Sequence, residues 1–481
     1  MVKFQLSDSK DHTPARAVLI SNENPDYGSL NLNPEETNTL QRIKEAKKSV
    51  ISFYKGAGTD LFQFLDSKSN QDATLEAARV AGANLAGELK SQNIQEITIS
   101  TDSKDNNILY GYAVGLALAS YRFSKYKKEA PDKSLKTVHI HGGIDKNGLD
   151  ELQAIVDGIY HARDLVNTPS SHQTAEELSI SIQEMGDMAG FKVEVLNKSK
   201  IEALKMGGLL SVAAGSIDPP TFNILEWKPE NAINQKPVIL VGKGVVFDTG
   251  GLTLKPTPNS MDQMKSDMAG AAAVAGTFYA LAKAKMPYHV IGLIPATDNR
   301  PGMKATAPSD VITMYGGITV EVMNTDAEGR LILGDALEYA KKYDPDIVID
   351  LATLTGAAVR AIGQYGIIFM GTADENDKAI LKKSGEETYE RLVELPLWDE
   401  YDDLLKSDVA DLRNVSPGTN AGAITAGKFL EHFTEGYPWV HLDIAGPAFI
   451  SSTDAYRTKN ATGSGIRLLI KYLKNRYPNA K

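Results

Sequence analysis

Four short apolar runs rich in β-branched residues constrain the fold of this chain most strongly. They read "PVILVG", "VIGLIPA", "DIVIDLA" and "WVHLDIAG". Strands that are apolar on both faces are typical of a mainly parallel sheet that helices cover on both sides. Helical patterns lie between and after these runs, at 268–284, 331–343, 421–433 and 466–473. This part of the sequence therefore predicts an α/β domain.

The first 150 residues show a similar alternation. "SVISFY", "QEITIST" and "TVHIHGG" are typical of strands, whereas "LEAARVAGANLAGEL" and "ILYGYAVGLALASYRF" are typical of helices. The length of 481 residues also favours more than one domain. We predict an α/β protein of two domains, each with a central mixed or mainly parallel sheet flanked by helices. The N-terminal domain covers 1–150 and has no clear role, a linking helix covers 151–166, and the C-terminal domain covers 167–481.

Composition excludes several classes of protein. The formal net charge of −10, without a long run of Lys or Arg, argues against nonspecific binding to nucleic acid. The absence of cysteine excludes disulfides, thiolate metal sites and a cysteine nucleophile. No stretch of about twenty apolar residues occurs, so we expect no membrane span. The first twenty residues lack the apolar core of a signal peptide, and we expect a cytoplasmic protein.

The octapeptide "NTDAEGRL" at 324–331 concentrates charge in an unusual way. Asp326, Glu328 and Arg330 alternate, so in an extended segment all three side chains point the same way. Two carboxylates at that spacing repel each other. A cation between them would remove the repulsion, whereas the plainer alternative is that both favour the start of the helix expected from Leu331.

A second charged segment follows the first apolar run and reads "GKGVVFDTGGLTLKPTPNSMDQMKSDMAGAA". Its "DTGG" is neither regular helix nor strand, because glycines permit positive φ and close backbone approach. Asp267 begins an Ala-rich helix, where a carboxylate is favoured without any metal. Taken with the octapeptide, however, the segment supplies enough acids for two divalent ions. These four carboxylates are Asp248, Asp267, Asp326 and Glu328.

Other chemistries lack their motifs. None of the eight histidines falls in the two segments, and no H-E-x-x-H occurs, which excludes a thermolysin-like zinc site. The sequence also lacks the P-loop, the G-x-G-x-x-G fingerprint and the G-x-S-x-G elbow. The residues alone predict a dinuclear hydrolase whose oxygen-rich ligands suit Mn²⁺, Mg²⁺ or Zn²⁺.

The two charged segments resemble the signatures of the leucyl aminopeptidase, or cytosol aminopeptidase, family. "NTDAEGRL" is similar to that family's hallmark octapeptide, and "VGKGVVFDTGG" with "MKSDMAGAA" resembles its other metal-binding stretch. "RDLVNTPS", "MGGLLSVAAGS", "LATLTGA" and "HLDIAGPAF" resemble further family blocks in the same order, so the likeness runs from about Arg163 to the C-terminus. It implies a metallo-aminopeptidase that hydrolyses N-terminal, mainly apolar residues of peptides through a hydroxide bridging two divalent metals.

The resemblance also implies roles for individual residues. Lys255 would be the electrophile near the scissile carbonyl, and Arg330 would hold a bicarbonate ion that acts as general base. Asp248 and Glu328 would bridge the two ions, which would be Mn²⁺ or Zn²⁺, possibly Mg²⁺. Lys243 would be neutral when it binds a metal. The full set of implied metal ligands is Lys243, Asp248, Asp267, Asp326 and Glu328. The implied pocket for the first side chain consists of Met264, Thr353, Ala445 and Ala448. Family members form homohexamers.

Three alternatives follow from the same sequence. The stretch between Lys255 and Asp267 is one residue longer than usual in the family; we place the extra residue at 256–260, but otherwise Asp262 would compete with Asp267 as ligand. The enzyme could instead be a narrow dipeptidase that cleaves substrates such as Cys-Gly. Some proteins of this kind bind DNA as architectural proteins, although the acidic composition argues against that function here.

Overall fold

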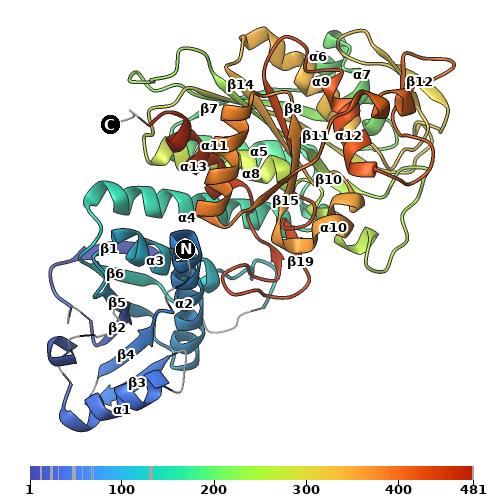
Figure 1. Ribbon diagram of the computed structural model, residues 1–481. Helices are drawn as coiled ribbons and strands as arrows, with labels where there is room; N and C mark the ends of the chain where they lie inside the picture. The colour runs from blue at the N-terminus through green and yellow to red at the C-terminus, as the bar shows by residue number, and fades with distance from the viewer. Residues whose placement is uncertain are drawn as a thin grey trace. The chain divides into compact units, whose positions relative to one another are not determined.

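The chain forms two compact units. The computed structural model describes residues 1–10, 13–21, 25, 27–30, 32–45, 50–56, 58–66, 68, 70–128 and 134–478 (Figure 1). Unit 1 consists of Met1–Tyr160 and Ser452–Lys459, and unit 2 consists of His161–Ser451 and Asn460–Lys481. The predicted linking helix lies within α4 (Lys146–Asn167), which runs across this division. Each described helix is too short or too polar to span a lipid bilayer.

Unit 1 contains a six-stranded sheet that is parallel except for one edge strand. Its order is β1 (Lys3–Ser7), β6 (Thr137–His141), β5 (Glu96–Thr101), β2 (Ala15–Ile20), β4 (Gly58–Phe64) and β3 (Ile51–Lys55), of which β3 is antiparallel to β4. The strands predicted in this part of the sequence correspond to β3, β5 and β6. The predicted helices correspond to α2 (Gln71–Ser91) and α3 (Asn106–Ser120), and a further helix, α1 (Pro34–Glu45), precedes them.

A segment from the C-terminal part of the chain completes unit 1. Residues Ser452–Lys459 belong to this unit although their neighbours on both sides belong to unit 2. The hydroxyl of Tyr456 lies 3.0 and 2.9 Å from the two carboxylate oxygens of Glu76 on α2. Arg79 donates to the same carboxylate at 2.9 Å. Because Tyr456 and Glu76 are both buried, this contact fixes the segment against α2.

Unit 2 contains a nine-stranded sheet whose four central strands are the four predicted apolar runs. These are β18 (Trp439–Asp443), β14 (Ile347–Ala352), β9 (Val238–Gly242) and β11 (Val290–Asn299), and they are mutually parallel. β10 (Gly244–Asp248) also pairs in parallel with β11. The sheet is completed on one side by β15 (Ile367–Gly371) and β16 (Leu392–Glu394), and on the other by β8 (Thr221–Trp227) and β7 (Lys192–Leu196).

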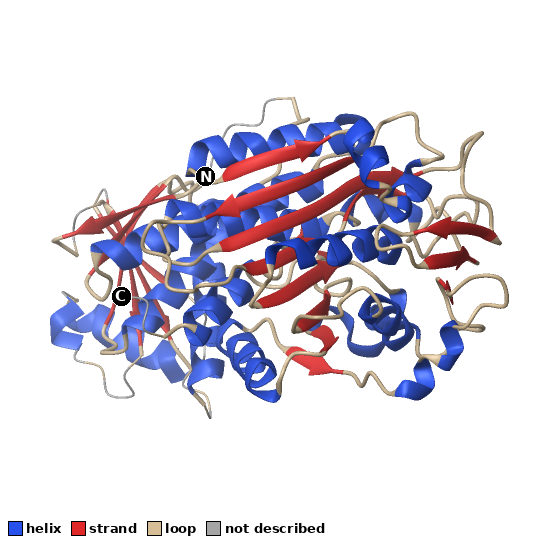
Figure 2. Cartoon of the chain, turned by 90° about the horizontal axis from the view of Figure 1, so that it is seen from above, coloured by secondary structure: helices blue, strands red, loops and turns tan. Residues whose placement is uncertain are grey.

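Helices cover both faces of this sheet (Figure 2). One face carries α5 (Ala175–Ala189), α8 (Ala269–Lys283), α11 (Glu375–Thr388) and α13 (Ile466–Arg476), and the other carries α7 (Gly207–Ala213), α9 (Gly329–Ala340) and α12 (Gly422–Glu431). Further elements of this unit are two short helices, α6 (Lys198–Leu204) and α10 (Gly356–Ile362). It also has a small sheet of β12 (Asp310–Thr313), β13 (Thr319–Val322) and β17 (Leu412–Arg413), and the pair β19 (Phe449–Ile450) and β20 (Asn460–Ala461). The predicted fold class is confirmed in both units.

The parallel strands place their carboxyl ends at one edge of the sheet. In open α/β sheets this edge is where ligands bind, because the loops that leave neighbouring strands converge there. The residues at or just after these ends include Lys243 after β9, Asp248 in β10, Asn299 in β11, Thr353 after β14 and Asp443 in β18. The fold therefore gathers polar side chains that are far apart in the sequence.

Candidate metal centre

Two lysines, the buried Lys243 and the half-buried Lys255, hold four carboxylates together at this edge. Lys243 Nζ lies 2.8 Å from Asp267 Oδ1 and 2.8 Å from Glu328 Oε1. Lys255 Nζ lies 2.8 Å from Asp248 Oδ2 and 2.5 Å from Asp326 Oδ1. The structure thus brings together all five residues predicted as metal ligands, together with Lys255.

Local structure explains how the acids reach the site. Asp267 lies between the short helix η3 (Met261–Ser266) and α8, and Glu328 directly precedes α9. A Cβ atom on Gly329 would lie only 2.5 Å from Lys243 Cε. A side chain at Gly329 would therefore push Lys243 away from the carboxylates, which explains a glycine at this point of the octapeptide.

The charges of the centre shift the pKa values of both lysines. Burial alone would lower the pKa of Lys243, but the carboxylates of Asp267, Glu328 and Asp248 outweigh burial and raise it. The pKa of Lys255 is likewise raised, because the neighbouring carboxylates, led by Asp248, outweigh the opposing effect of burial. Both lysines are thus cations among these carboxylates at neutral pH.

The carboxylates themselves do not share one environment. Burial and the charge of Glu328 raise the pKa of Asp248 to about 6, although Lys255 and Lys243 oppose this. Burial also raises the pKa values of Asp267 and Asp326. For Glu328, by contrast, Lys243 and Lys255 outweigh burial and lower the pKa.

The donor set fits divalent cations. One carboxylate oxygen from each of Asp248, Asp326 and Glu328 lies within 4.8 Å of the others. Asp267 Oδ2 is buried and has no hydrogen-bond partner among the described residues. Four carboxylates against two ammonium groups leave the cluster with excess negative charge, and buried charge is stable only when it is paired or bound to metal. Hard oxygen donors of this kind suit divalent ions.

The geometry also distinguishes between the two aspartates considered for one ligand position. Asp267 is 5% exposed and contacts Lys243. Asp262 is exposed, and its Oδ1 accepts a hydrogen bond from the backbone N–H of Ser260. Asp267, and not Asp262, is therefore the aspartate of this stretch that faces the centre.

Arg330 is a buried cation beside the cluster. Its Nη1 donates to the carbonyl oxygen of Asn414 at 2.8 Å, whereas its Nε finds no acceptor in the described part of the chain. Burial lowers the pKa of Arg330 to about 10, opposed by the charges of Glu328 and Asp443, so the guanidinium remains charged at neutral pH. A buried guanidinium with a free N–H is suited to a small oxyanion.

Of the four residues predicted to line the side-chain pocket, Thr353 and Met264 contact Asp267 of the centre. Thr353 Oγ1 donates to Asp267 Oδ1 at 2.8 Å, and the carbonyl oxygen of Met264 accepts from the backbone N–H of Asp267 at 3.2 Å. The backbone N–H of Ala445 donates to Asp443 Oδ1 at 3.2 Å. Ala448 is 3% exposed and offers almost no surface of its own.

Three buried side chains that support the centre were not predicted from the sequence. Asp443 accepts from the backbone N–H of Leu354 and from the hydroxyl of Thr355, which fixes the loop after β14. Thr325 Oγ1 donates to the carbonyl oxygen of Gly250 at 2.7 Å, which joins the two charged segments. Asn299 also contacts both segments, because its Nδ2 donates to Asp248 Oδ1 and to the carbonyl oxygen of Thr325. The only feature of the sequence that could have indicated these three residues is that each is polar and lies at or beyond the end of an apolar run.

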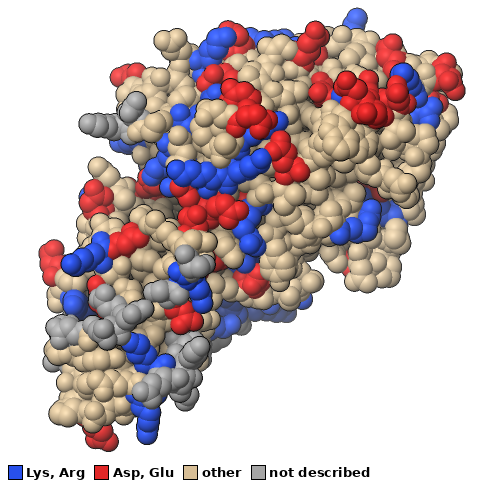
Figure 3. Space-filling model, viewed as in Figure 1, with Lys and Arg blue, Asp and Glu red and all other residues tan. Residues whose placement is uncertain are grey.

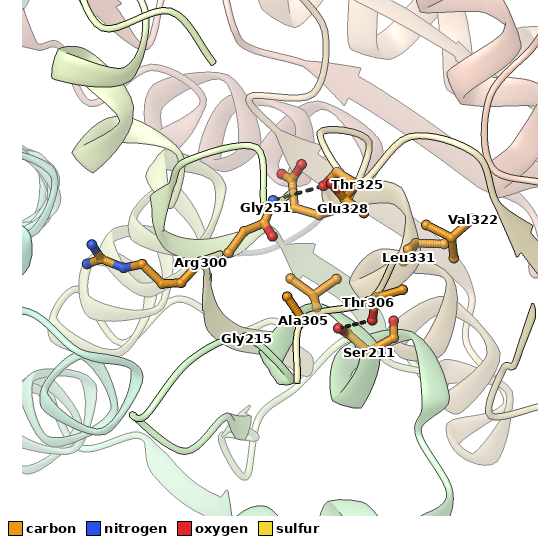
Figure 4. A pocket seen from close by; sticks show the side chains of 12 residues that line it. Ser211, Gly215, Gly251, Arg300, Ala305, Thr306, Val322, Thr325, Glu328 and Leu331 are labelled. Atoms are coloured by element: carbon orange, nitrogen blue, oxygen red, sulfur yellow. Dashed lines mark hydrogen bonds between the residues drawn. The ribbon is translucent and has the colours of Figure 1, made fainter. Parts of the chain in front are cut away.

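A small cavity adjoins the centre. It measures about 10 Å³, is lined by Glu328, Thr325, Gly251 and Asn299 among others, and has room for about one water molecule. Figure 4 shows Glu328, Thr325 and Gly251 at one end of this cavity, with Thr306 hydrogen-bonded to the carbonyl of Ser211 at another.

Comparison with known proteins agrees with this geometry. The sequence model described as the catalytic domain of the cytosol aminopeptidase family matches residues 160–470. The chain belongs to the cytosol aminopeptidase family. A probable cytosol aminopeptidase of Chlorobium limicola is 46% identical over 82% of this chain and 83% of its own length. Another, from Chlorobium phaeobacteroides, is 42% identical over 93% of each chain, so the likeness extends beyond Arg163 into the N-terminal third.

Solved structures of the same kind are similar over nearly the whole chain. The bottromycin maturation enzyme BotP in complex with Mn superposes with a TM-score of 0.85 at 30% identity, over 96% of this chain and 99% of that one. Membership of the cytosol aminopeptidase family makes this protein a hydrolase, specifically a metallo-aminopeptidase. The family resemblance expected from the charged segments is therefore confirmed.

Proposed function

We propose that this aminopeptidase removes N-terminal, mainly apolar, leucine-like residues from peptides at a centre of two divalent ions. The supporting observation is the pairing of four carboxylates with two lysines at the carboxyl edge of the sheet. The proposed ligands are Lys243, Asp248, Asp267, Asp326 and Glu328. When bound, the two ions would lower the pKa of a bound water and would give the free α-amine of the substrate a coordination site.

Lys243 can be a ligand only in its neutral form. Among the carboxylates alone its pKa is raised, because they outweigh burial. Two adjacent divalent cations would reverse that balance and, together with burial, lower the pKa. Lys243 would then lose its proton when the metals bind, which links its deep burial to its proposed role.

Lys255 and Arg330 are the proposed catalytic residues. Lys255 is the more exposed of the two lysines in the centre, with 14% of its side chain accessible against 3% for Lys243. It can therefore reach a substrate carbonyl and stabilise the negative charge that develops on its oxygen. Arg330 would hold a bicarbonate ion as general base, and its buried, cationic guanidinium supports this role.

The residues proposed to contact the first side chain of the substrate favour an uncharged, apolar group. They are Met264, Thr353, Ala445 and Ala448. Three of the four carry short side chains and none is charged, so the pocket would accept an apolar side chain without a charged partner. This composition supports a preference for leucine-like residues.

Metal, location and assembly complete the proposal. The Mn complex of BotP supports Mn²⁺, and the oxygen-rich donor set also suits Zn²⁺ or Mg²⁺. The names of the relatives support a cytoplasmic location.

We also propose that the protein assembles as a homohexamer, because family members do so. Apart from the other copies of the chain, its proposed partners are peptide substrates. Light scattering of the active enzyme would test this assembly, and a fully active monomer would contradict it.

Two other functions are less well supported. A narrow Cys-Gly dipeptidase would use the same centre, and a panel of dipeptides and longer peptides would distinguish it from a broad aminopeptidase. DNA binding needs a continuous basic surface, whereas acidic and basic side chains are interspersed on the face drawn in Figure 3, and the net charge is −10. Filter binding at low and high salt would reveal such an activity by its steep salt dependence.

The proposed function is tested by metal removal and replacement. The enzyme is stripped with a chelator, and hydrolysis of leucine anilide is measured after addition of Mn²⁺, Zn²⁺ or Mg²⁺. We expect no activity without metal and full activity at two ions per chain. One ion per chain in the fully active enzyme would contradict the dinuclear centre.

A further inference from the structure

Asn299 joins the two charged segments through one amide group. It ends β11, opposite Asp248 in the β10–β11 pair, and is 4% exposed. Its Nδ2 donates to Asp248 Oδ1 at 2.8 Å and to the carbonyl oxygen of Thr325 at 2.9 Å. Asn299 thus contacts a carboxylate from one segment and the backbone of the other.

The chemistry of these neighbours allows only one orientation of the amide. Asp248 Oδ1 and the Thr325 carbonyl are both acceptors, so the group that faces them must have two N–H donors. An aspartate at this position would place a third acceptor oxygen against these two and would have no N–H to donate to them. On its other side, Asn299 Oδ1 would lie 2.8 Å from a Cβ on Gly251, so only glycine allows the amide to lie so close to that loop.

The contact determines which oxygen of Asp248 is available. Asp248 Oδ1 accepts from Asn299 Nδ2 and also from the backbone N–H of Gly250 at 2.8 Å. Asp248 Oδ2 instead faces Lys255 at 2.8 Å. The amide therefore turns the carboxylate so that one oxygen is held by the protein and the other points into the centre.

We propose that Asn299 is a positioning residue that presents Asp248 Oδ2 to the divalent ions. This inference rests on the proposed dinuclear centre and assigns it a residue outside the ligand set. Removing a residue that orients a metal ligand through a hydrogen bond typically weakens metal binding by about 10–100-fold.

A purely structural role is the competing explanation. Thr325 also joins the two segments, since its Oγ1 donates to the Gly250 carbonyl and accepts from the backbone N–H of Thr253. If Asn299 only strengthens this connection, its loss would lower stability without a specific effect on metal binding. Measuring metal affinity and stability separately distinguishes the two roles.

The sheet offers a matched control. Asn223 on β8 is also a fully buried asparagine, and its Nδ2 donates to the carbonyl of Ile294 on the same strand β11 at 3.2 Å. It makes no hydrogen bond to a proposed ligand among the described residues. Asn223→Ala should therefore report the cost of losing a buried asparagine from this sheet.

Two variants of Asn299 are needed because the cavity beside it has room for a water. After Asn299→Ala a water could enter and replace the lost donor. Asn299→Leu keeps a branched side chain of four heavy atoms and has no donor, so it fills the space that a water would need and excludes that compensation. It also serves as the second variant if the alanine protein does not fold.

The experiment measures Mn²⁺ binding to the full-length enzyme by equilibrium dialysis, and unfolding midpoints in the presence of chelator. We expect wild type and Asn223→Ala to bind two ions with equal affinity. Asn299→Leu should bind one of the two ions about 10–100-fold more weakly, and high Mn²⁺ should restore much of its kcat. Asn299→Ala should lie between wild type and the leucine variant.

The outcomes separate this inference from the proposed function. If wild type binds no Mn²⁺, the dinuclear centre itself is wrong, and the role of Asn299 is wrong with it. If wild type binds two ions and Asn299→Leu binds them equally well, or is weakened no more than Asn223→Ala, the positioning role is wrong while the centre remains.

Discussion

The hydroxyl of Thr353 donates a hydrogen bond of 2.8 Å to Asp267 Oδ1. The carbonyl oxygen of Thr353 accepts from Lys243 Nζ at 3.1 Å. A residue expected to line the substrate pocket therefore also contacts two of the proposed metal ligands, and if both roles hold, substrate selection and metal binding would be coupled in one short loop.

Replacing Thr353 tests this coupling. Thr353→Val keeps the shape of the side chain but removes the donor, and we expect metal affinity to fall by about tenfold. Thr353→Ser keeps the donor and should retain wild-type affinity. Mn²⁺ titration of both variants is the measurement. A valine variant with a changed KM but unchanged metal affinity would restrict Thr353 to substrate contact.

Lys243 and Lys255 should respond differently to truncation. Lys243→Ala removes a proposed ligand and should weaken one metal position while the other remains loaded. Lys255→Ala should keep both ions and lower kcat by about 10²–10³-fold, as expected for the loss of one group that stabilises the oxyanion. Metal content and kcat of both variants decide the matter. Loss of metal from Lys255→Ala alone would reverse the two roles.

A free α-amine should be essential in the substrate. The amine needs its lone pair to occupy a coordination site, and acetylation delocalises that lone pair. We expect leucine anilide to be hydrolysed and its N-acetylated form to resist hydrolysis. The two compounds are compared at equal concentration with the same metal-loaded enzyme. Efficient cleavage of the acetylated compound would show that the amine is not bound in this way.

Asp335 on α9 should make stability depend on pH. Burial raises its pKa to about 7, although the backbone N–H groups of Leu209 and Tyr315 oppose this by donating to its two oxygens. The unfolded chain has an ordinary aspartate pKa of about 3.9. The folded protein therefore binds the proton more tightly, and this residue's contribution to the free energy of unfolding falls as pH rises from about 4 to about 7.

The substitution Asp335→Asn isolates this contribution, because asparagine does not ionise. Urea unfolding of both proteins at pH 5, 6, 7 and 8 gives the difference in free energy of unfolding, wild type minus variant. We expect that difference to decrease up to about pH 7 and then to level off. The other titrating groups cancel in the difference. A value independent of pH would show that Asp335 is ionised throughout.

The sequence predicted the centre of the fold because the decisive strands are apolar on both faces. β9, β11, β14 and β18 lie side by side, and their shared direction brings the acids to one edge. The end of β11 was not predicted, since the apolar pattern stops at Ala296 while the strand continues to Asn299. The last of these polar residues, Asn299, is buried and hydrogen-bonds to Asp248 and Thr325 on distant segments, which a local pattern cannot reveal.

The two ammonium groups show a second limit of sequence reasoning. In the fold, each of Lys243 and Lys255 contacts two of the four carboxylates. Their positions in the sequence do not reveal which two carboxylates each lysine contacts. Which acids share a lysine depends on how the loop after β10 meets the octapeptide. Side-chain hydroxyls such as that of Thr325 determine this meeting, and hydroxyls carry no periodic signal.

The return of Ser452–Lys459 to unit 1 affects how the protein can be divided into fragments. A polypeptide beginning at His161 would retain this loop but lack α2, and Tyr456, which is 1% exposed, would lose Glu76 and face water. Conversely, a fragment ending at Tyr160 would lack the loop that covers α2. Since β19 and β20 pair at the base of the loop, an excised catalytic unit would need a short turn between them as well as a new N-terminus.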